Sequence, residues 1–299
     1  MSQDKEKIVI TGGSGFVGKH LTKLLLSEGY DVVHLSRSVN SKAGVKTYEW
    51  NIKKKAVDVR ALENASHIIH LAGAGVADKP WTYKRKLEIV KSRIDGIPFL
   101  LEAVQKNNIA LKSFISSSGI NYYGTKTSEH IYTESDQAGD DFLAKTCVYW
   151  ENYADKFSSV CRVVKLRTGV VLDKNEGALV KMMEPFKYGL GAAIGSGKQY
   201  MPWIHIDDLC RMYLHAIKNN NLKGAYNACA PQHITNADVS KHIAKYLNKK
   251  VWLPNVPSFL MKLLLGDMAD ILLQGSRCSC EKIIATGFVF EKDSLEKVF

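Results

Sequence analysis

A glycine-rich turn near the start of the chain constrains its fold more than any other feature. The turn, TGGSGFVG at residues 11–18, follows the apolar run KIVI and precedes a stretch of helical spacing that stops at Gly29. In this setting Gly12 permits a tight turn, Gly15 lets the backbone approach a pyrophosphate, and Gly18 allows close packing of helix on strand. The pattern predicts a phosphate-binding loop, the alternative being a glycine-rich turn without a ligand.

The helix after this turn would strengthen phosphate binding. Its N-terminus offers N–H groups without helical partners and a partial positive charge. The residues that we expect at the ligand are Gly12, Gly13, Ser14, Gly15, Phe16, Val17 and Gly18.

Short apolar runs alternate with amphipathic stretches over the first 172 residues. Runs at 31–37, near 70, at 113–119 and at 161–172 predict strands. Spacing at 16–28, 94–107 and 149–156 predicts helices. Nearly continuous apolar strands separated by helices are typical of parallel sheets covered on both faces. We therefore predict an α/β fold with a Rossmann-like, doubly wound parallel sheet.

The pattern changes after Leu172 and indicates a smaller lobe. Residues 174–204 are rich in glycine, whereas MPWIHIDDL leads into a helix near 206–218, with Asp207 or Asp208 near its N-cap. GAYNACAP predicts a strand that returns to the main sheet. We therefore expect a nucleotide-binding domain at 1–173, completed by about 205–230. The segments 174–204 and 231–299 would form a C-terminal substrate lobe.

The net charge of +11 over 299 residues does not by itself identify a partner. The lysines are scattered, which is typical of a solvated surface and which would also favour an anionic small ligand. No nucleic-acid-reading module is recognisable, so we expect no nucleic-acid partner. The most apolar late segment, 259–273, contains Lys262, Asp267 and Asp270 and is too short to span a bilayer, so we expect no membrane partner.

The N-terminus and the cysteines favour a cytoplasmic location. The first residues, MSQDKEKIVITGG, are charged and lack the apolar core of a signal peptide. The six cysteines are irregularly spaced, and Cys278 and Cys280 have no second pair that would complete a zinc site. We therefore expect reduced thiols and no metal.

The end of the second predicted strand bears on the cofactor. Strands at this place in NAD-binding folds usually end in Asp or Glu, whereas this one ends in Ser36 and Arg37. A guanidinium suits a 2′-phosphate, which favours NADP(H), although a surface arginine at a strand end is the alternative. Leu71, Ala72 and Gly73 end the strand near residue 70 and would leave room for the adenosine.

Several motifs together resemble the extended or atypical short-chain dehydrogenase/reductase superfamily. They are GGSGFVG, LAGAG, SFISSSG followed by YYG, RTGVVL and WIHIDDL. The longer runs KLEIVKSR, DFLAKTCVYWE and GDMADILLQG narrow the resemblance to the epimerase-like family of YfcH-type and 39U-type proteins. That resemblance implies NADP(H), with Ser36, Arg37, Leu71, Ala72, Glu88, Arg93 and Val171 at the cofactor. Arg93 would pair with Glu88 or with a phosphate.

The same resemblance raises a question about catalysis. Active members use a serine or threonine with Tyr-x-x-x-Lys on a helix. Ser118 matches the serine, but aligning Glu151 with the family's glutamate puts Leu143 at the tyrosine position and Cys147 at the lysine position. Lys145 and Tyr149 occur in reversed order and on another side of the helix, so we expect Tyr149 to face solvent or the lobe.

Other side chains are candidates to replace the missing pair. Tyr122 and Tyr123 follow Ser118, and His205, the Asp207–Asp208 pair and Trp203 could face a cleft, with ordinary packing or capping as the alternative for each. We predict Ser118 and Tyr123 as catalytic residues. The sequence favours an NADP(H)-dependent oxidoreductase or epimerase acting on a small carbonyl or sugar-like compound, or alternatively an NADP(H)-binding regulator with little turnover. By analogy with the superfamily, a homodimer is expected.

Overall fold

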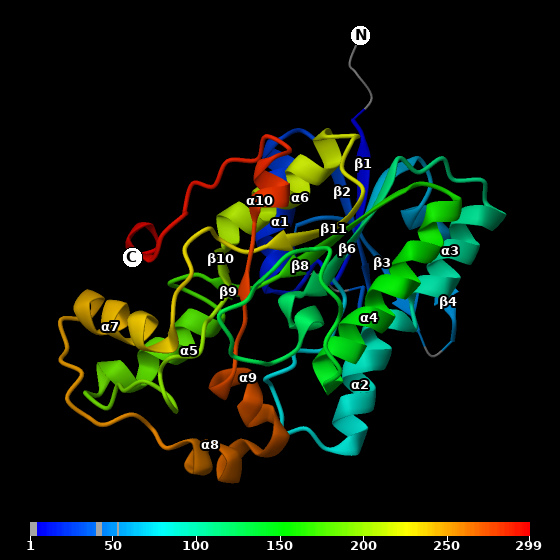
Figure 1. Ribbon diagram of the computed structural model, residues 1–299. Helices are drawn as coiled ribbons and strands as arrows, with labels where there is room; N and C mark the ends of the chain where they lie inside the picture. Colours follow the sequence, from blue (N-terminus) through cyan, green and yellow to red (C-terminus); the bar gives the residue numbers. More distant parts are fainter. Residues whose placement is uncertain (1–4, 40–43, 53) are drawn as a thin grey trace.

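A mostly parallel sheet forms the centre of the molecule (Figure 1). The computed structural model describes residues 5–39, 44–52 and 54–299, so the first four residues of the charged N-terminus lie outside it. Within these ranges the sheet has eight strands in the order β11-β8-β6-β5-β1-β2-β3-β4, and only the β3–β4 pair is antiparallel. The strands are β1 Lys7–Thr11, β2 Asp31–Ser36, β3 Thr47–Asn51, β4 Ala56–Val57, β5 Ala65–His70, β6 Ser113–Gly119, β8 Arg162–Thr168 and β11 Gly224–Ala228.

Helices cover both faces of this sheet, as its apolar strands predict (Figure 1). In β1, Ile8 and Ile10 pack with α1 Phe16–Ser27 and α6 Ile206–Lys218, whereas Val9 points to the other face. There it packs with α3 Ile97–Lys106 and α4 Phe142–Asp155. Alternate residues of a strand point to opposite faces, so a fully apolar strand requires both helical layers. The predicted α/β, doubly wound fold is confirmed.

The predicted smaller lobe lies to one side of the central sheet (Figure 1). It contains α5 Ala178–Lys187, α7 Asn236–Tyr246, α8 Ser258–Leu265 and α9 Asp270–Leu273, and a short parallel pair of β9 Val170–Leu172 and β10 Trp203–His205. Phe186, Val239, Ile243 and Leu295 share a separate apolar core. The chain then returns to the main body, where α10 Glu281–Ile284 packs near β11.

Several elements differ from the sequence prediction, and strands β3 and β4 and helix α5 were not predicted at all. The run at 161–172 is not one strand, because β8 ends before Gly169 and β9 leaves the sheet to pair with β10. A Cβ at Gly169 would lie 2.7 Å from the carbonyl O of Pro202, so only glycine allows this close crossing. The helix α2, Tyr83–Ile94, was not predicted, because most of its residues are charged or polar. No helix in the described ranges has the length and apolar character needed to cross a bilayer.

Candidate functional site

The glycine turn connects β1 to α1 and adopts the expected shape. Gly12 has φ of +74°, and a Cβ there would lie 2.9 Å from the backbone N of Ala72 at the end of β5. The N–H of Gly15 donates to the carbonyl O of Gly12 at 3.0 Å, which closes the turn. A Cβ at Gly18 would lie 2.5 Å from the same oxygen. The steric roles predicted for Gly12 and Gly18 are confirmed.

The N-terminus of α1 is open to an anion. Its N-cap is Gly15, which supplies no side-chain acceptor to the first N–H groups of the helix. Ser14 and Gly15 are exposed, while the half-buried Phe16 approaches Gly177 of the smaller lobe. Helix N–H groups without a capping side chain bind phosphate oxygens well, so the turn fits a dinucleotide pyrophosphate.

Positive side chains gather near the end of β2. Arg37 is exposed directly after the strand, and Ser36 is half-buried. Glu88 of α2 accepts a hydrogen bond from Nη1 of Arg85 at 2.7 Å. This contact lowers the pKa of Glu88, and the charge of Arg37 has a smaller effect in the same direction. The suggested pairing of Glu88 with Arg93 is therefore wrong, because Arg85 takes that role.

Arg93 lies instead between the end of β5 and α4. A Cβ added at Gly73 would meet its guanidinium group 3.2 Å away, and the guanidinium lies 5.0 Å from the ring centre of Trp150. Its Nη1 donates to the carbonyl O of Ile89 at 2.8 Å. Burial and Glu151 raise the pKa of Cys147 to about 12, while Arg93 acts in the opposite direction. Arg93 is therefore a cation close to both Gly73 and Cys147.

The side of helix α4 that carries Leu143, Cys147 and Glu151 faces the protein interior. All three residues are buried, whereas Lys145 is exposed and Tyr149 is 52% exposed. Asp141 is the N-cap of the helix, and its carboxylate accepts from the N–H of Ala144 at 2.9 Å. The predicted solvent-facing position of Tyr149 is confirmed.

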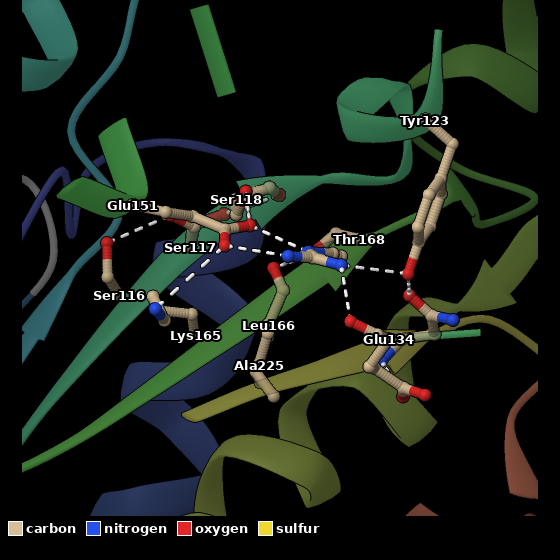
Figure 2. Close-up of polar contacts among 12 residues, drawn as sticks. Ser116, Ser117, Ser118, Tyr123, Glu134, Glu151, Lys165, Leu166, Thr168 and Ala225 are labelled. Carbon is tan, nitrogen blue, oxygen red and sulfur yellow. Dashed lines mark hydrogen bonds and ion pairs between the residues drawn. The ribbon is translucent and has the colours of Figure 1, made fainter. Parts of the chain in front are cut away.

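A buried polar network occupies the space beneath α4 (Figure 2). Glu151 accepts from Oγ of Ser118 at 2.8 Å and from Nε and Nη2 of Arg167 at 2.8 and 2.9 Å. Nη1 of Arg167 donates to the hydroxyl of Tyr123 at 2.9 Å, and that hydroxyl donates to Oδ1 of Asn227 at 2.8 Å. Burial raises the pKa of Tyr123. The catalytic roles assigned to Ser118 and Tyr123 remain predictions, since both hydroxyls already have partners here.

Sequence reasoning did not identify Arg167 or Asn227 as members of the site. The signal was the charge inside an apolar strand: Lys165 and Arg167 interrupt VVKLRTG, and each must find a carboxylate when the strand is buried. Glu151 is that carboxylate for Arg167, whereas Lys165 pairs with Asp155 at 2.7 Å and lies 4.0 Å from Glu151. Glu151 lies on α4 and Arg167 lies on β8, so spacing along the chain does not reveal that they pair.

Of the other suggested replacements, Trp203, His205 and Asp208 are buried, whereas Tyr122 is half-buried and Asp207 is exposed. Trp203 is fully buried, which excludes stacking on a substrate in this conformation. His205, not an aspartate, is the N-cap of α6, and its Nδ1 accepts from the N–H of Asp207 at 3.2 Å. Asp208 is buried and accepts from the backbone N–H groups of Glu291 and Lys292. Asp208 thereby holds the C-terminal segment against α6.

A cavity of about 260 Å³ lies near the starts of α2 and α4. The smaller lobe contributes Asp267, Asp270 and Ile271. Leu143 also lines the cavity, so the position matched to the superfamily's tyrosine borders open space. The remaining lining residues are Trp81, Lys86, Thr125, Asp141 and Phe142. Val171, in β9, is half-buried and pairs with Ile204 of β10.

Comparisons with known proteins agree with this architecture. A model of the NAD dependent epimerase/dehydratase family matches residues 8–229, and one of a domain of unknown function, DUF1731, matches residues 256–299. The epimerase family protein YfhF of Bacillus subtilis is 33% identical over 291 residues, covering 97% of this chain and 95% of YfhF. Human epimerase family protein SDR39U1 is 31% identical over 288 residues, covering 95% of each chain.

Solved structures show the same relationship. The crystal structure of human SDR39U1 with NADPH superposes with a TM-score of 0.88 at 30% identity, covering 98% of this chain and 97% of the human one. The UDP-glucose 4-epimerase of Thermus thermophilus, solved with NAD, has the same fold with a TM-score of 0.75 at 20% identity, covering 98% of this chain and 96% of its own. The chain therefore belongs to the NAD-dependent epimerase/dehydratase family, as an atypical short-chain dehydrogenase/reductase of the 39U type that its motifs predicted.

Proposed function

We propose that the protein is an NADP(H)-binding, epimerase-like oxidoreductase that acts on a small carbonyl or sugar-like compound without the usual Tyr-x-x-x-Lys pair. One observation carries the proposal: the glycine loop, Arg37 and Arg93 follow or adjoin the carboxyl ends of the neighbouring strands β1, β2 and β5. Ligands of open parallel sheets bind at this edge. The NADPH in the crystal structure of human SDR39U1 supports the same cofactor here.

The residues at this edge suit the parts of NADP(H). The uncapped N–H groups of α1 would bind the pyrophosphate, and Arg37 with Ser36 would bind the 2′-phosphate. When bound, the nicotinamide would donate or accept a hydride. Arg93 would supply a cation near Cys147, at the position where superfamily members carry lysine, and burial lowers the pKa of its guanidinium. We infer that Arg93 takes over the electrostatic part of that role.

No residue of α4 replaces the superfamily's tyrosine as the group that transfers a proton. Leu143 carries no exchangeable proton, and burial holds the thiol of Cys147 in its neutral form. Ser118 could donate a proton only if a substrate displaced Glu151 as the partner of its Oγ. The cavity beside Leu143 is the place where such a substrate would lie.

The closed network favours a second candidate function, an NADP(H)-binding regulator or redox sensor with little turnover. Ser118 and Tyr123 are both buried, and each hydroxyl donates to a protein acceptor. Buried networks with every member satisfied usually hold structure, because opening them leaves polar groups unpaired. In this case NADP(H) binding would be retained without turnover.

A substrate screen separates the two functions. NADPH oxidation would be measured against panels of carbonyl compounds and sugar nucleotides, with Ser118→Ala, Tyr123→Phe and the exposed control Tyr149→Phe. We expect turnover that falls in Ser118→Ala and stays unchanged in Tyr149→Phe. Tight NADPH binding with no turnover on any compound would refute the oxidoreductase and support the regulator.

The choice of cofactor has its own test. Replacing Arg37 by Asp should weaken NADPH binding by about tenfold or more, because a charge-assisted contact becomes a repulsion. NADH binding should not weaken, because NADH has no 2′-phosphate. Fluorescence titration measures both affinities, with Lys23→Asp on the exposed side of α1 as the control. An unchanged NADPH affinity would show that Arg37 does not contact the 2′-phosphate.

A further inference from the structure

Helix α8 is an apolar helix that buries none of its residues. Its sequence is SFLMKLLL, yet Phe259, Leu263 and Leu264 are 73%, 79% and 66% exposed. In Figure 1 it lies at the lower edge of the smaller lobe, away from the central sheet. Side chains of this kind normally face the core of their own protein, so their exposure on α8 indicates a binding surface.

The exposed side chains are grouped rather than scattered. Phe259 and Leu263 are four residues apart, as are Leu260 and Leu264, so each pair shares one side of the helix and the two sides adjoin. We call these four residues together with Lys262 the α8 surface. Single exposed apolar residues are common on soluble proteins, whereas a grouped set marks an interaction site.

Residues 249–265, which include the α8 surface, carry charges of one sign only. From residue 249 to 265 the sequence contains Lys249, Lys250 and Lys262 and no aspartate or glutamate. The next carboxylate, Asp267, is paired with Lys86 at 2.7 Å. Trp252 in the same stretch is 69% exposed. The segment therefore combines large apolar side chains with lysines that carry no compensating carboxylate of their own segment.

The combination of exposed apolar side chains and lysines favours a lipid surface over a second copy of the chain. A two-fold contact between copies of the chain would set a lysine-bearing surface without carboxylates against itself, which is repulsive. An anionic lipid surface instead accepts apolar side chains at the acyl boundary and lysines at the headgroup phosphates. We propose that the α8 surface binds the interface of an anionic lipid membrane, with Phe259, Leu263 and Leu264 inserted and Lys262 at the headgroups.

The contact is peripheral, because α8 has 8 residues and a span needs about 20. The expectation of no membrane partner came from the inability of this segment to span a bilayer, and an interfacial helix has no such requirement. The proposal also does not depend on the proposed function, since α8 contributes no side chain to the cavity lining.

Vesicle co-sedimentation of the full chain tests the proposal. The vesicles would be pure phosphatidylcholine, or phosphatidylcholine with about a third phosphatidylglycerol, at low salt. We expect binding to the anionic vesicles at least about tenfold stronger than to the neutral ones, and weaker binding at higher salt. Equal binding to both, or binding to neither, would overturn the proposal.

Matched variants locate the contact. Leu263→Ser with Leu264→Ser, and separately Lys262→Glu, should each weaken vesicle binding by about tenfold. Val289→Ser, at a residue 69% exposed elsewhere, and Lys223→Glu, at an exposed lysine, should leave binding unchanged. Unaltered circular dichroism spectra and NADPH titrations would confirm that the variants are folded. Wild-type binding by both α8 variants, or a vesicle-free dimer that they dissociate in sedimentation velocity, would overturn the proposal.

Discussion

At the scale of single residues, a buried carboxylate organises the site where the superfamily places a tyrosine and a lysine. Glu151 is 5% exposed and compensates the guanidinium of Arg167, which is 3% exposed. Lys165 approaches the same carboxylate at 4.0 Å. Charges held so far from water are stable only while each has its partner, because an isolated buried charge costs several kcal/mol.

We therefore predict that Glu151→Gln destabilises the fold by about 3–5 kcal/mol, although glutamine keeps the shape of the side chain. The substitution removes the negative charge and leaves the guanidinium of Arg167 buried without a counterion. Urea unfolding followed by circular dichroism measures the free energy of unfolding. Lys145→Gln, on the exposed side of the same helix, should change it by less than about 0.5 kcal/mol. A similar small loss for both variants would show that the pair contributes little.

The sequence predicted the local features of the site but not the contacts between distant segments. The glycine loop is contiguous and each of its glycines has a local steric task, so Gly12 and Gly18 were identified correctly. The side of α4 that faces the interior was also predictable, because Leu143 and Glu151 lie about two turns apart on the same helix. The partners of Glu151 were not, since they come from β6 and β8, and only the folded sheet brings them together.

At the scale of elements, the start of α4 links the main domain to the cavity. Asp141 is the N-cap of the helix, and it also accepts hydrogen bonds from the N–H and Oγ1 of Thr125 at 2.7 and 3.1 Å. We predict that Asp141→Ala destabilises the protein by about 1–2 kcal/mol, through the loss of the cap. Thermal unfolding measures the effect, with the exposed neighbour Asp140→Ala as the control. Equal melting temperatures for the two variants would contradict the capping role.

The sequence predicted the elements that have a strong apolar pattern. It missed those that depend on a close backbone contact or on ion pairs. The apolar runs of β1, β5 and β6 were identified because burial on both faces leaves a continuous signal. The break between β8 and β9 was missed, because it depends on the close approach of Pro202 to Gly169. Helix α2 was missed because its charged side chains form ion pairs, such as Arg85 with Glu88, in place of a broad apolar stripe.

At the scale of the whole molecule, the central sheet contains three buried histidines on strands β2 and β5, which flank β1. They are His34 on β2 and His67 and His70 on β5, each 1% exposed or less and each hydrogen-bonded to a serine or threonine hydroxyl. Burial lowers the pKa of all three, that of His70 to about 4. Burial therefore favours the neutral form of all three imidazoles.

This arrangement predicts that acid weakens the fold well above the pKa of its carboxylates. Below about pH 6.5 the unfolded chain takes up a proton at each histidine, whereas folded His70 does so only near pH 4. The stability that neutral His70 contributes is thus complete above pH 6.5 and is lost as the pH falls toward 4, by about 3 kcal/mol. Urea unfolding between pH 7.5 and about 4.5 should show this decline, and it should be shallower in His70→Gln than in wild type or Lys145→Gln. An equally steep decline in all three proteins would mean that His70 is not the group that titrates.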